Sequence, residues 1–141
     1  MPSGIGSTGN VGIGTTTPAN PLQMGSGAHV TAGGVWTNAS SRTLKDQIAD
    51  LPASRAMDAI ERLKPVTFVY KANPTEAHVG FIAEDVPDLV ATADRKSLAA
   101  MDIVAVLTKV AQEQQATIAD LQARVARLEV QLAQAVADVA K

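Results

Sequence analysis

The segment IVAVLTKVAQEQQATIADLQARVARLEVQLAQAVADVAK, residues 103–141, places apolar side chains alternately three and four positions apart. Neither glycine nor proline interrupts it, and the alternation is regular from Ile118 onward. Such a heptad predicts a long C-terminal helix that packs with other helices in a coiled coil. The predicted core positions are Val104, Leu107, Ala111, Gln114, Ile118, Leu121, Val125, Leu128 and Leu132, and the pattern continues to Ala135 and Val139.

The predicted helix needs partner helices, because a single amphipathic helix in water would leave its apolar seam exposed. Identical chains are the simplest partners. Gln114 is a polar core position, and such a residue lowers stability but can determine register and strand number. Arg124 at g and Glu129 at the next e favour a parallel arrangement, although an exposed ion pair contributes only about 0–1 kcal/mol. The mixed aliphatic core is compatible with two strands as well as three.

The middle of the chain carries the signals of a small α+β unit. PASRAMDAIERLK, residues 52–64, repeats its apolar residues at helical spacing, and Pro65 ends that predicted helix. Residues 66–71 and 78–83 are rich in β-branched and aromatic residues and predict two strands, with a turn over residues 72–77. We expect a β-hairpin packed on the helix.

The N-terminal segment is rich in glycine: residues 1–34 hold nine of the ten glycines in the chain. Its composition is compatible with a flexible linker, because a single chain of this kind buries little apolar surface. The alternative is a strand-and-turn segment that shares a core with other chains. Apolar residues between turn signals in NVGIG and PLQM favour the second interpretation.

Composition excludes several classes of function. Twelve Lys and Arg face 14 Asp and Glu, so the 141 residues offer no basic surplus for nucleic acid. There is no cysteine, and the two histidines, His29 and His78, form no metal-binding pattern. No apolar run is long enough to span a membrane, and no signal-peptide pattern is visible. We therefore expect no cofactor, metal, nucleic acid or membrane partner.

The composition changes within TNASSRTLKDQ, residues 37–47, where Arg42 is the first charged residue. A serine becomes a nucleophile when a base takes its proton, and Ser40 and Lys45 are candidates for that pair. A helix would place these side chains about 140° apart and a strand about 16 Å apart, so only a turn brings them together. Ser41 and Lys45 would instead share a helix face. On spacing alone, an N-cap serine beside a solvated lysine is the simpler interpretation.

Three segments carry a family resemblance. SSRTLKDQI, residues 40–48, resembles an S-D-x-x-L-K-x-x-I box; LKPVTFVYK with HVGFIAEDVPDLV resembles a strand followed by a GFIAQEV segment; and SLAAMDIVAVLTKVAQEQQ resembles the start of a long terminal helix. Together they resemble the C-terminal intramolecular chaperone and auto-processing domain of phage tail spikes and tail fibres, the endosialidase-type chaperone domain. Upstream, GNVGIGTTTPANPLQM resembles a motif that ends fibre and adhesin shafts ahead of this domain.

The resemblance implies a homotrimer that registers the upstream fibre or spike domains of the same protein and then cuts itself off. The family's box serine and lysine map onto Ser40 as nucleophile and Lys45 as base, with the bond between Ala39 and Ser40 cut. Cleavage one bond later, after Ser40, stays open. The implied location is a virion tail fibre or spike, assembled in the bacterial host cytoplasm. Ser41 stands where the family has Asp, which puts the cleavage itself in question.

The expected architecture is thus α+β, with three parts. Residues 1–39 form the end of a glycine-rich β shaft that depends on a trimer, residues 40–102 the helix-plus-hairpin chaperone and auto-processing part, and residues 103–141 the parallel trimeric coiled coil. The main alternative function is a permanent trimerisation tip of a fibre or adhesin that never cuts. The same domain also suits the self-cleaving oligomeriser of a membrane-bound transcription factor, but no DNA-binding or membrane segment supports that.

Overall fold

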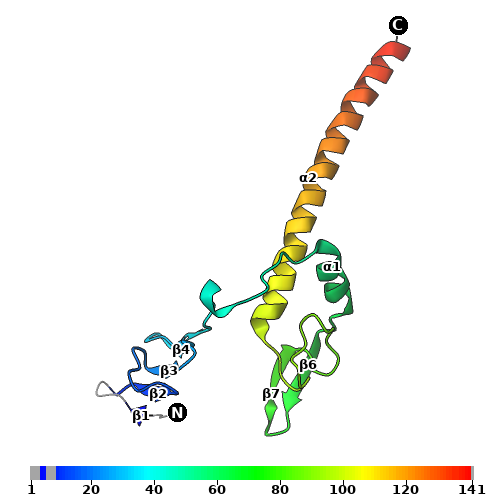
Figure 1. Ribbon diagram of the computed structural model, residues 1–141. Coiled ribbons are helices and arrows are strands. Elements are labelled where there is room, and N and C mark those ends of the chain that lie inside the picture. Colours follow the sequence, from blue (N-terminus) through cyan, green and yellow to red (C-terminus); the bar gives the residue numbers. More distant parts are fainter. Residues whose placement is uncertain (1–3, 6–8, 141) are drawn as a thin grey trace. The chain divides into compact units, whose positions relative to one another are not determined.

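The computed structural model describes residues 4–5 and 9–140 (Figure 1). By their contacts, the residues form two compact units, one ending at Ala49 and the other beginning at Asp50. The parts of the expected shaft and terminal helix that fall on residues 1–3, 6–8 and 141 lie outside the described residues. The three-part division at residues 39/40 and 102/103 stays a prediction.

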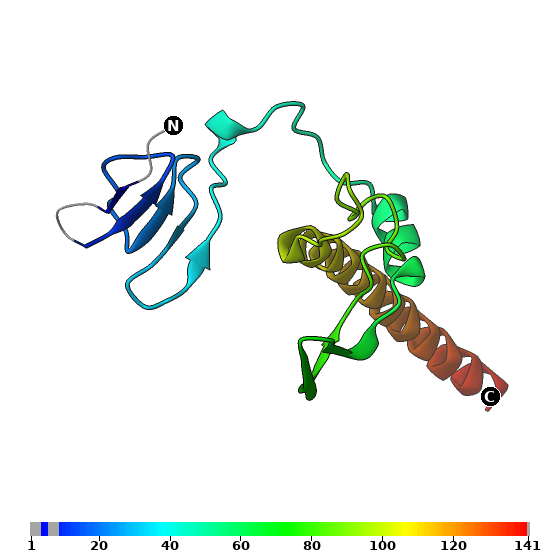
Figure 2. The same cartoon turned by 90° about the horizontal axis from the view of Figure 1, so that it is seen from below.

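The N-terminal unit is a sheet of five short strands in sequential order (Figures 1 and 2). Strands β2 and β3 are parallel, and the other neighbours are antiparallel. The described part of the glycine-rich segment therefore has the strand-and-turn structure that its apolar residues indicated. The strands are β1 (Gly4–Ile5), β2 (Val11–Ile13), β3 (Leu22–Met24), β4 (His29–Val30) and β5 (Trp36–Thr37).

Two glycines in this sheet have no room for a side chain. A Cβ on Gly12 would lie 2.3 Å from the carbonyl oxygen of Thr15, and one on Gly25 would lie 2.5 Å from that of Gly14. Gly14 also has φ +75°, which L-residues with a side chain rarely adopt. The glycine content thus follows from tight turns and close backbone approach.

The C-terminal unit contains two helices and a hairpin. Helix α1 (Ala53–Arg62) lies within the predicted range, and Pro52 precedes its first residue. Strands β6 (Val66–Tyr70) and β7 (Asn73–Gly80) form a two-stranded sheet. Helix α2 (Ala100–Val139) is one continuous helix of 40 residues, which confirms the expected α+β layout with a long C-terminal helix (Figure 1). None of the helices in the described ranges is both long and apolar enough to cross a membrane.

The hairpin turn was predicted in the wrong place. Residues 73–77, which lie in the predicted turn, belong to β7, and the chain reverses at Lys71 and Ala72, between the paired residues Tyr70 and Asn73. Pro74 lies within β7, which is an edge strand of a two-stranded sheet. A proline is tolerated there because its missing N–H can face solvent. The pairing of β6 with β7 ends at Val66 and Gly80, and Val66 directly follows Pro65. Residues 81–83, which were predicted as part of the second strand, therefore lie outside the sheet.

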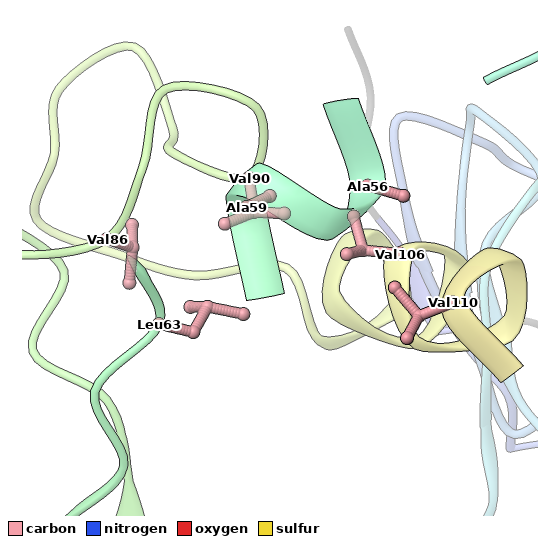
Figure 3. Close-up of a cluster of buried hydrophobic side chains, with 7 residues drawn as sticks. All are labelled: Ala56, Ala59, Leu63, Val86, Val90, Val106 and Val110. Carbon is pink, nitrogen blue, oxygen red and sulfur yellow. The ribbon is translucent and has the colours of Figure 1, made fainter. Parts of the chain in front are cut away.

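The predicted packing of the hairpin on the first helix is also wrong, because α1 packs along α2 instead. The small side chains Ala56 and Ala59 of α1 are 0 and 1 % exposed, and they allow Val106 and Val110 of α2 to approach closely. Figure 3 shows the cluster that these side chains form with three further residues. The buried cluster consists of Ala56, Ala59, Leu63, Val86, Val90, Val106 and Val110.

The loop between β7 and α2 is held in place by Arg95. Its guanidinium donates hydrogen bonds to the carbonyl oxygens of Glu84 (3.3 Å) and Val86 (3.1 Å) and forms an ion pair with Asp88. Asp94 accepts a backbone hydrogen bond from Lys96, which lowers the pKa of that carboxyl group. These contacts join distant parts of the loop, which supplies Val86 and Val90 to the buried cluster.

The core positions predicted for the coiled coil lie on a different face of α2 from Val106 and Val110. Those two valines occupy c and g of the heptad and face α1. The aliphatic positions a and d are open to solvent in the single chain, at 46 to 66 % exposure: Val104, Leu107, Ile118, Leu121, Val125, Leu128 and Leu132. Packing within the chain therefore leaves the predicted seam unused, and the trimer stays a prediction.

A matched pair of substitutions on α2 tests this assignment of the core. Val106 is 2 % exposed and Val130, at the f position, is 70 % exposed. Both Val→Ala changes alter helix propensity equally, so their difference reports burial alone. We expect V106A to lower the free energy of unfolding by about 1–3 kcal/mol more than V130A. Urea denaturation at one protein concentration measures this, and equal values would contradict the core assignment.

Candidate functional site

The segment after β5 forms a tight turn stabilised by Ser41. The 3-10 helix η1 (Arg42–Leu44) follows it, and the Ser41 Oγ accepts a hydrogen bond from the Thr43 N–H at 3.3 Å. The Ser41 and Thr43 hydroxyls lie 2.9 Å apart. The backbone closes the turn through the Leu44 N–H to the Ser41 carbonyl at 3.0 Å and the Lys45 N–H to the Arg42 carbonyl at 3.1 Å.

This turn brings Lys45 back to Ser40. The Lys45 Nζ donates a hydrogen bond to the Ser40 Oγ at 2.7 Å. The sequence spacing required a turn for these two side chains to meet, and that is the local structure found here. The distance lies within the range for a nucleophile and its base. The catalytic roles of the two residues stay a prediction.

The pair is open to water in the single chain. Every residue from Ser40 to Asp50 is exposed, and the ammonium group of Lys45 acts as the donor. A lysine becomes a proton acceptor only when burial or nearby positive charge favours its neutral form. The geometry of the two atoms is therefore in place, whereas the burial that would activate them has to come from outside this segment.

The contact of Ser41 with Thr43 shows what the serine does at the position where the S-D-x-x-L-K-x-x-I box has Asp. Asp and Ser are both preferred at the N-cap, because the side-chain oxygen of each accepts a backbone N–H of the first turn. Ser41 makes that bond here. The change from Asp to Ser thus removes a charge but keeps the cap. Sequence reasoning did not assign a role to Thr43, although a Ser-x-Thr spacing is typical of a side-chain-capped turn.

The two histidines, His29 and His78, contact neighbouring backbone and aromatic groups. The His29 Nδ1 is 3.0 Å from the Gly27 carbonyl oxygen. The ring of His78 stacks on Phe68, with centroids 5.7 Å apart, and lies at 64° to the ring of Tyr70, with centroids 5.1 Å apart. Within the described part of the chain, no three His, Asp or Glu side chains gather in a way that could hold a metal ion.

Comparison with known families identifies the segment that begins at Ser40. Residues 40–95 match a peptidase family described as chaperone of endosialidase. This confirms the family resemblance for a segment that includes Ser40, Lys45, α1 and the hairpin. The five-stranded sheet and α2 lie outside the match. None of the curated proteins and none of the solved structures compared with the chain matches it. In general terms, the family supports an intramolecular chaperone role in a phage tail setting.

Proposed function

We propose that this chain is an intramolecular chaperone that trimerises through α2, registers a phage tail fibre or spike, and then releases itself by cutting the bond between Ala39 and Ser40. The observation that carries the proposal is the 2.7 Å contact between the Lys45 Nζ and the Ser40 Oγ. The match to a peptidase family begins at Ser40 and supports it independently. The setting would be the virion tail, with assembly in the host cytoplasm.

The proposed chemistry is an acyl shift followed by hydrolysis. Neutral Lys45 takes the hydroxyl proton of Ser40, and the Oγ attacks the carbonyl carbon of Ala39. The C–N bond breaks, the amine of Ser40 gains a proton, and an ester joins the Ala39 carbonyl to the Ser40 Oγ. Water hydrolyses that ester to the Ala39 carboxylate and a free N-terminal Ser40. No cofactor or metal takes part in these steps.

Assembly would activate the site. Lys45 is exposed in the single chain, and the turn that carries it offers no burial of its own. In the proposed trimer, neighbouring copies cover this segment, exclude water and favour the neutral amine. Cleavage would then follow assembly, so that an unassembled chain keeps its chaperone.

The apolar seam of α2 supports the proposed oligomer. Its core side chains are exposed along the whole length of the helix, and an apolar groove of about 480 Å³ runs between Met57 of α1 and the seam residues Gln114 and Ile118. Three copies would fill these surfaces with one another. A coiled coil forms from local contacts and raises the effective concentration of the attached sheets to about the millimolar range.

The alternative is a permanent trimerisation tip with the same fold. The exposure of Ser40 and Lys45 and the missing carboxylate at Ser41 favour it. It differs from the proposal only in the chemistry at Ser40, so one measurement separates the two.

Autocleavage is tested by intact mass spectrometry of freshly purified protein. We expect a fragment of residues 40–141, about 10 to 11 kDa of the 14.6 kDa chain. S40A and K45A should stay at full length, because each removes one member of the pair. K45R keeps the positive charge but cannot act as a base, and should also stay uncut.

If only the full-length mass is found after prolonged incubation, the autocleavage hypothesis is wrong and the permanent trimerisation tip is favoured. A fragment that starts at Ser41 would move the cut to the following bond. K71A is the matched control, because Lys71 is also exposed and basic but lies outside the turn that joins Ser40 to Lys45, so it should cut normally.

The role of the N-cap is tested at Ser41. S41A removes the bond to the Thr43 N–H, and a lost N-cap costs about 0.5–2 kcal/mol. We expect S41A to slow the appearance of the fragment by roughly two- to thirtyfold if that cost falls on the reactive geometry. S41D keeps a capping oxygen and adds the family's carboxylate, so it should cut at least as fast as the natural sequence. A time course that is the same for all three would show that the cap does not position Lys45.

The oligomer is tested in the S40A background, which keeps the chain intact. Leu128 at d and Val130 at f are similarly exposed in the single chain, at 63 and 70 %. A charge at the two positions should therefore have different effects only if the d position is buried between helices of different chains. Light scattering should give three times the 14.6 kDa chain mass for S40A and for S40A with V130D. Adding L128D should give the chain mass, because it buries three carboxylates in the core. A mass of two chains would correct the strand number.

A further inference from the structure

The sheet of the N-terminal unit separates its side chains into two faces. Successive residues of a strand alternate between faces, and paired residues of neighbouring strands share one. The registers therefore place every large apolar side chain of β2 to β5 together. This apolar sheet face consists of Val11, Ile13, Leu22, Met24, Val30 and Trp36, joined by the pairs Val11 with Leu22, Ile13 with Met24, Leu22 with Val30, and Val30 with Trp36.

The opposite face has a different composition. Gly12 pairs with Gln23, Gln23 with His29, and His29 with Thr37, so this polar sheet face carries no large apolar side chain in β2 to β5. The sheet thus has an apolar face and a polar face. The loop before β3 already covers part of the polar face: Gly12 is buried beside Thr15, and the Gln23 Oε1 accepts a hydrogen bond from the Ala19 N–H at 2.8 Å.

The apolar sheet face lacks a covering layer. Val11, Ile13 and Trp36 are 40, 45 and 49 % exposed, and none of the six side chains on this face is buried. Strands of two or three residues are held together weakly unless a second layer buries one face. This unit provides no such layer from its own described residues.

We propose that the apolar sheet face is covered by the same face of other copies of this chain. The proposal rests on the assembly through α2 proposed above. The first 41 residues contain no Asp, Glu, Lys or Arg, so identical faces meet without charge repulsion and without burying a charge. The seam of α2 is a second, separate surface that also requires identical helices.

Other occupants fit this face less well. An anionic lipid surface attracts basic side chains, which this segment lacks. A glycan needs several free hydrogen-bonding groups beside an aromatic ring. Trp36 pairs with the aliphatic Val30, and its indole N–H already donates to the Asn38 Oδ1 at 2.7 Å. The self-complementary face therefore identifies the surface that the chaperone has to register: a slip of one residue in one strand would turn its apolar side chains to the wrong face.

Trp36 is the single tryptophan of the chain and lies on the apolar sheet face, so its fluorescence reports the proposed contact. In the full S40A chain, we expect acrylamide to quench Trp36 several-fold less than in the L128D monomer of the same background. Adding I13D should restore quenching, while light scattering still shows the α2 oligomer. T37D places the same charge on the polar sheet face and should leave Trp36 protected.

Three further variants guard against local unfolding. I13T keeps a β-branched residue suited to a strand and should weaken the protection in part. Because the chain has no cysteine, I13C and T37C each add one thiol, and a short bismaleimide should link copies through I13C only.

The outcomes separate the two proposals. An oligomer in which Trp36 is quenched as in the monomer would overturn the sheet contact and leave the assembly through α2 standing. A monomeric S40A chain would overturn both. Equal loss of protection in I13D and T37D would also overturn the contact, since protection would then depend on the integrity of the sheet. Protection that appears only with lipid vesicles or glycans would assign the face to another partner.

Discussion

Helix α2 can serve two kinds of partner because its apolar side chains are divided between two faces. Val106 and Val110 are buried against the alanines of α1, and this contact forms the core of the C-terminal unit. Val104 and Leu107 point elsewhere and stay exposed. If the intrachain contact used the a and d positions, no seam would be left for other copies. The helix therefore folds its own chain and keeps a free surface, which is the arrangement that an assembly factor needs.

The candidate site follows a different constraint, because its geometry is local. A capped turn of a few residues brings the Lys45 Nζ to the Ser40 Oγ, and no distant element is required. Local geometry does not supply burial, however, and a lysine needs burial or positive neighbours to act as a base. Under the proposed function, burial on assembly would activate this site only after the shaft has formed.

The two units also differ in how they can assemble. A long helix gains its contacts from neighbours in sequence, whereas a sheet of very short strands depends on distant pairings and on a covered face. The sheet has six exposed or half-buried apolar side chains on one side and no charge to direct their association. In the proposed function, a coiled coil of α2 would supply the missing concentration of copies, and cutting the link afterwards would leave the shaft kinetically trapped.

Sequence alone predicted the elements whose signals are local. The heptad indicated α2, helical spacing between two prolines indicated α1, and the Ser40–Lys45 spacing indicated that a turn was needed. It placed the hairpin turn wrongly, because the start of β7 depends on its pairing with the end of β6, where Tyr70 pairs with Asn73. It also paired α1 with the hairpin, because helical spacing predicts that α1 has an apolar face but not which element packs against that face. Only the tertiary structure decided that α1 packs on α2 and that Val11, Leu22 and Trp36 share one face, because register is a relation between distant residues.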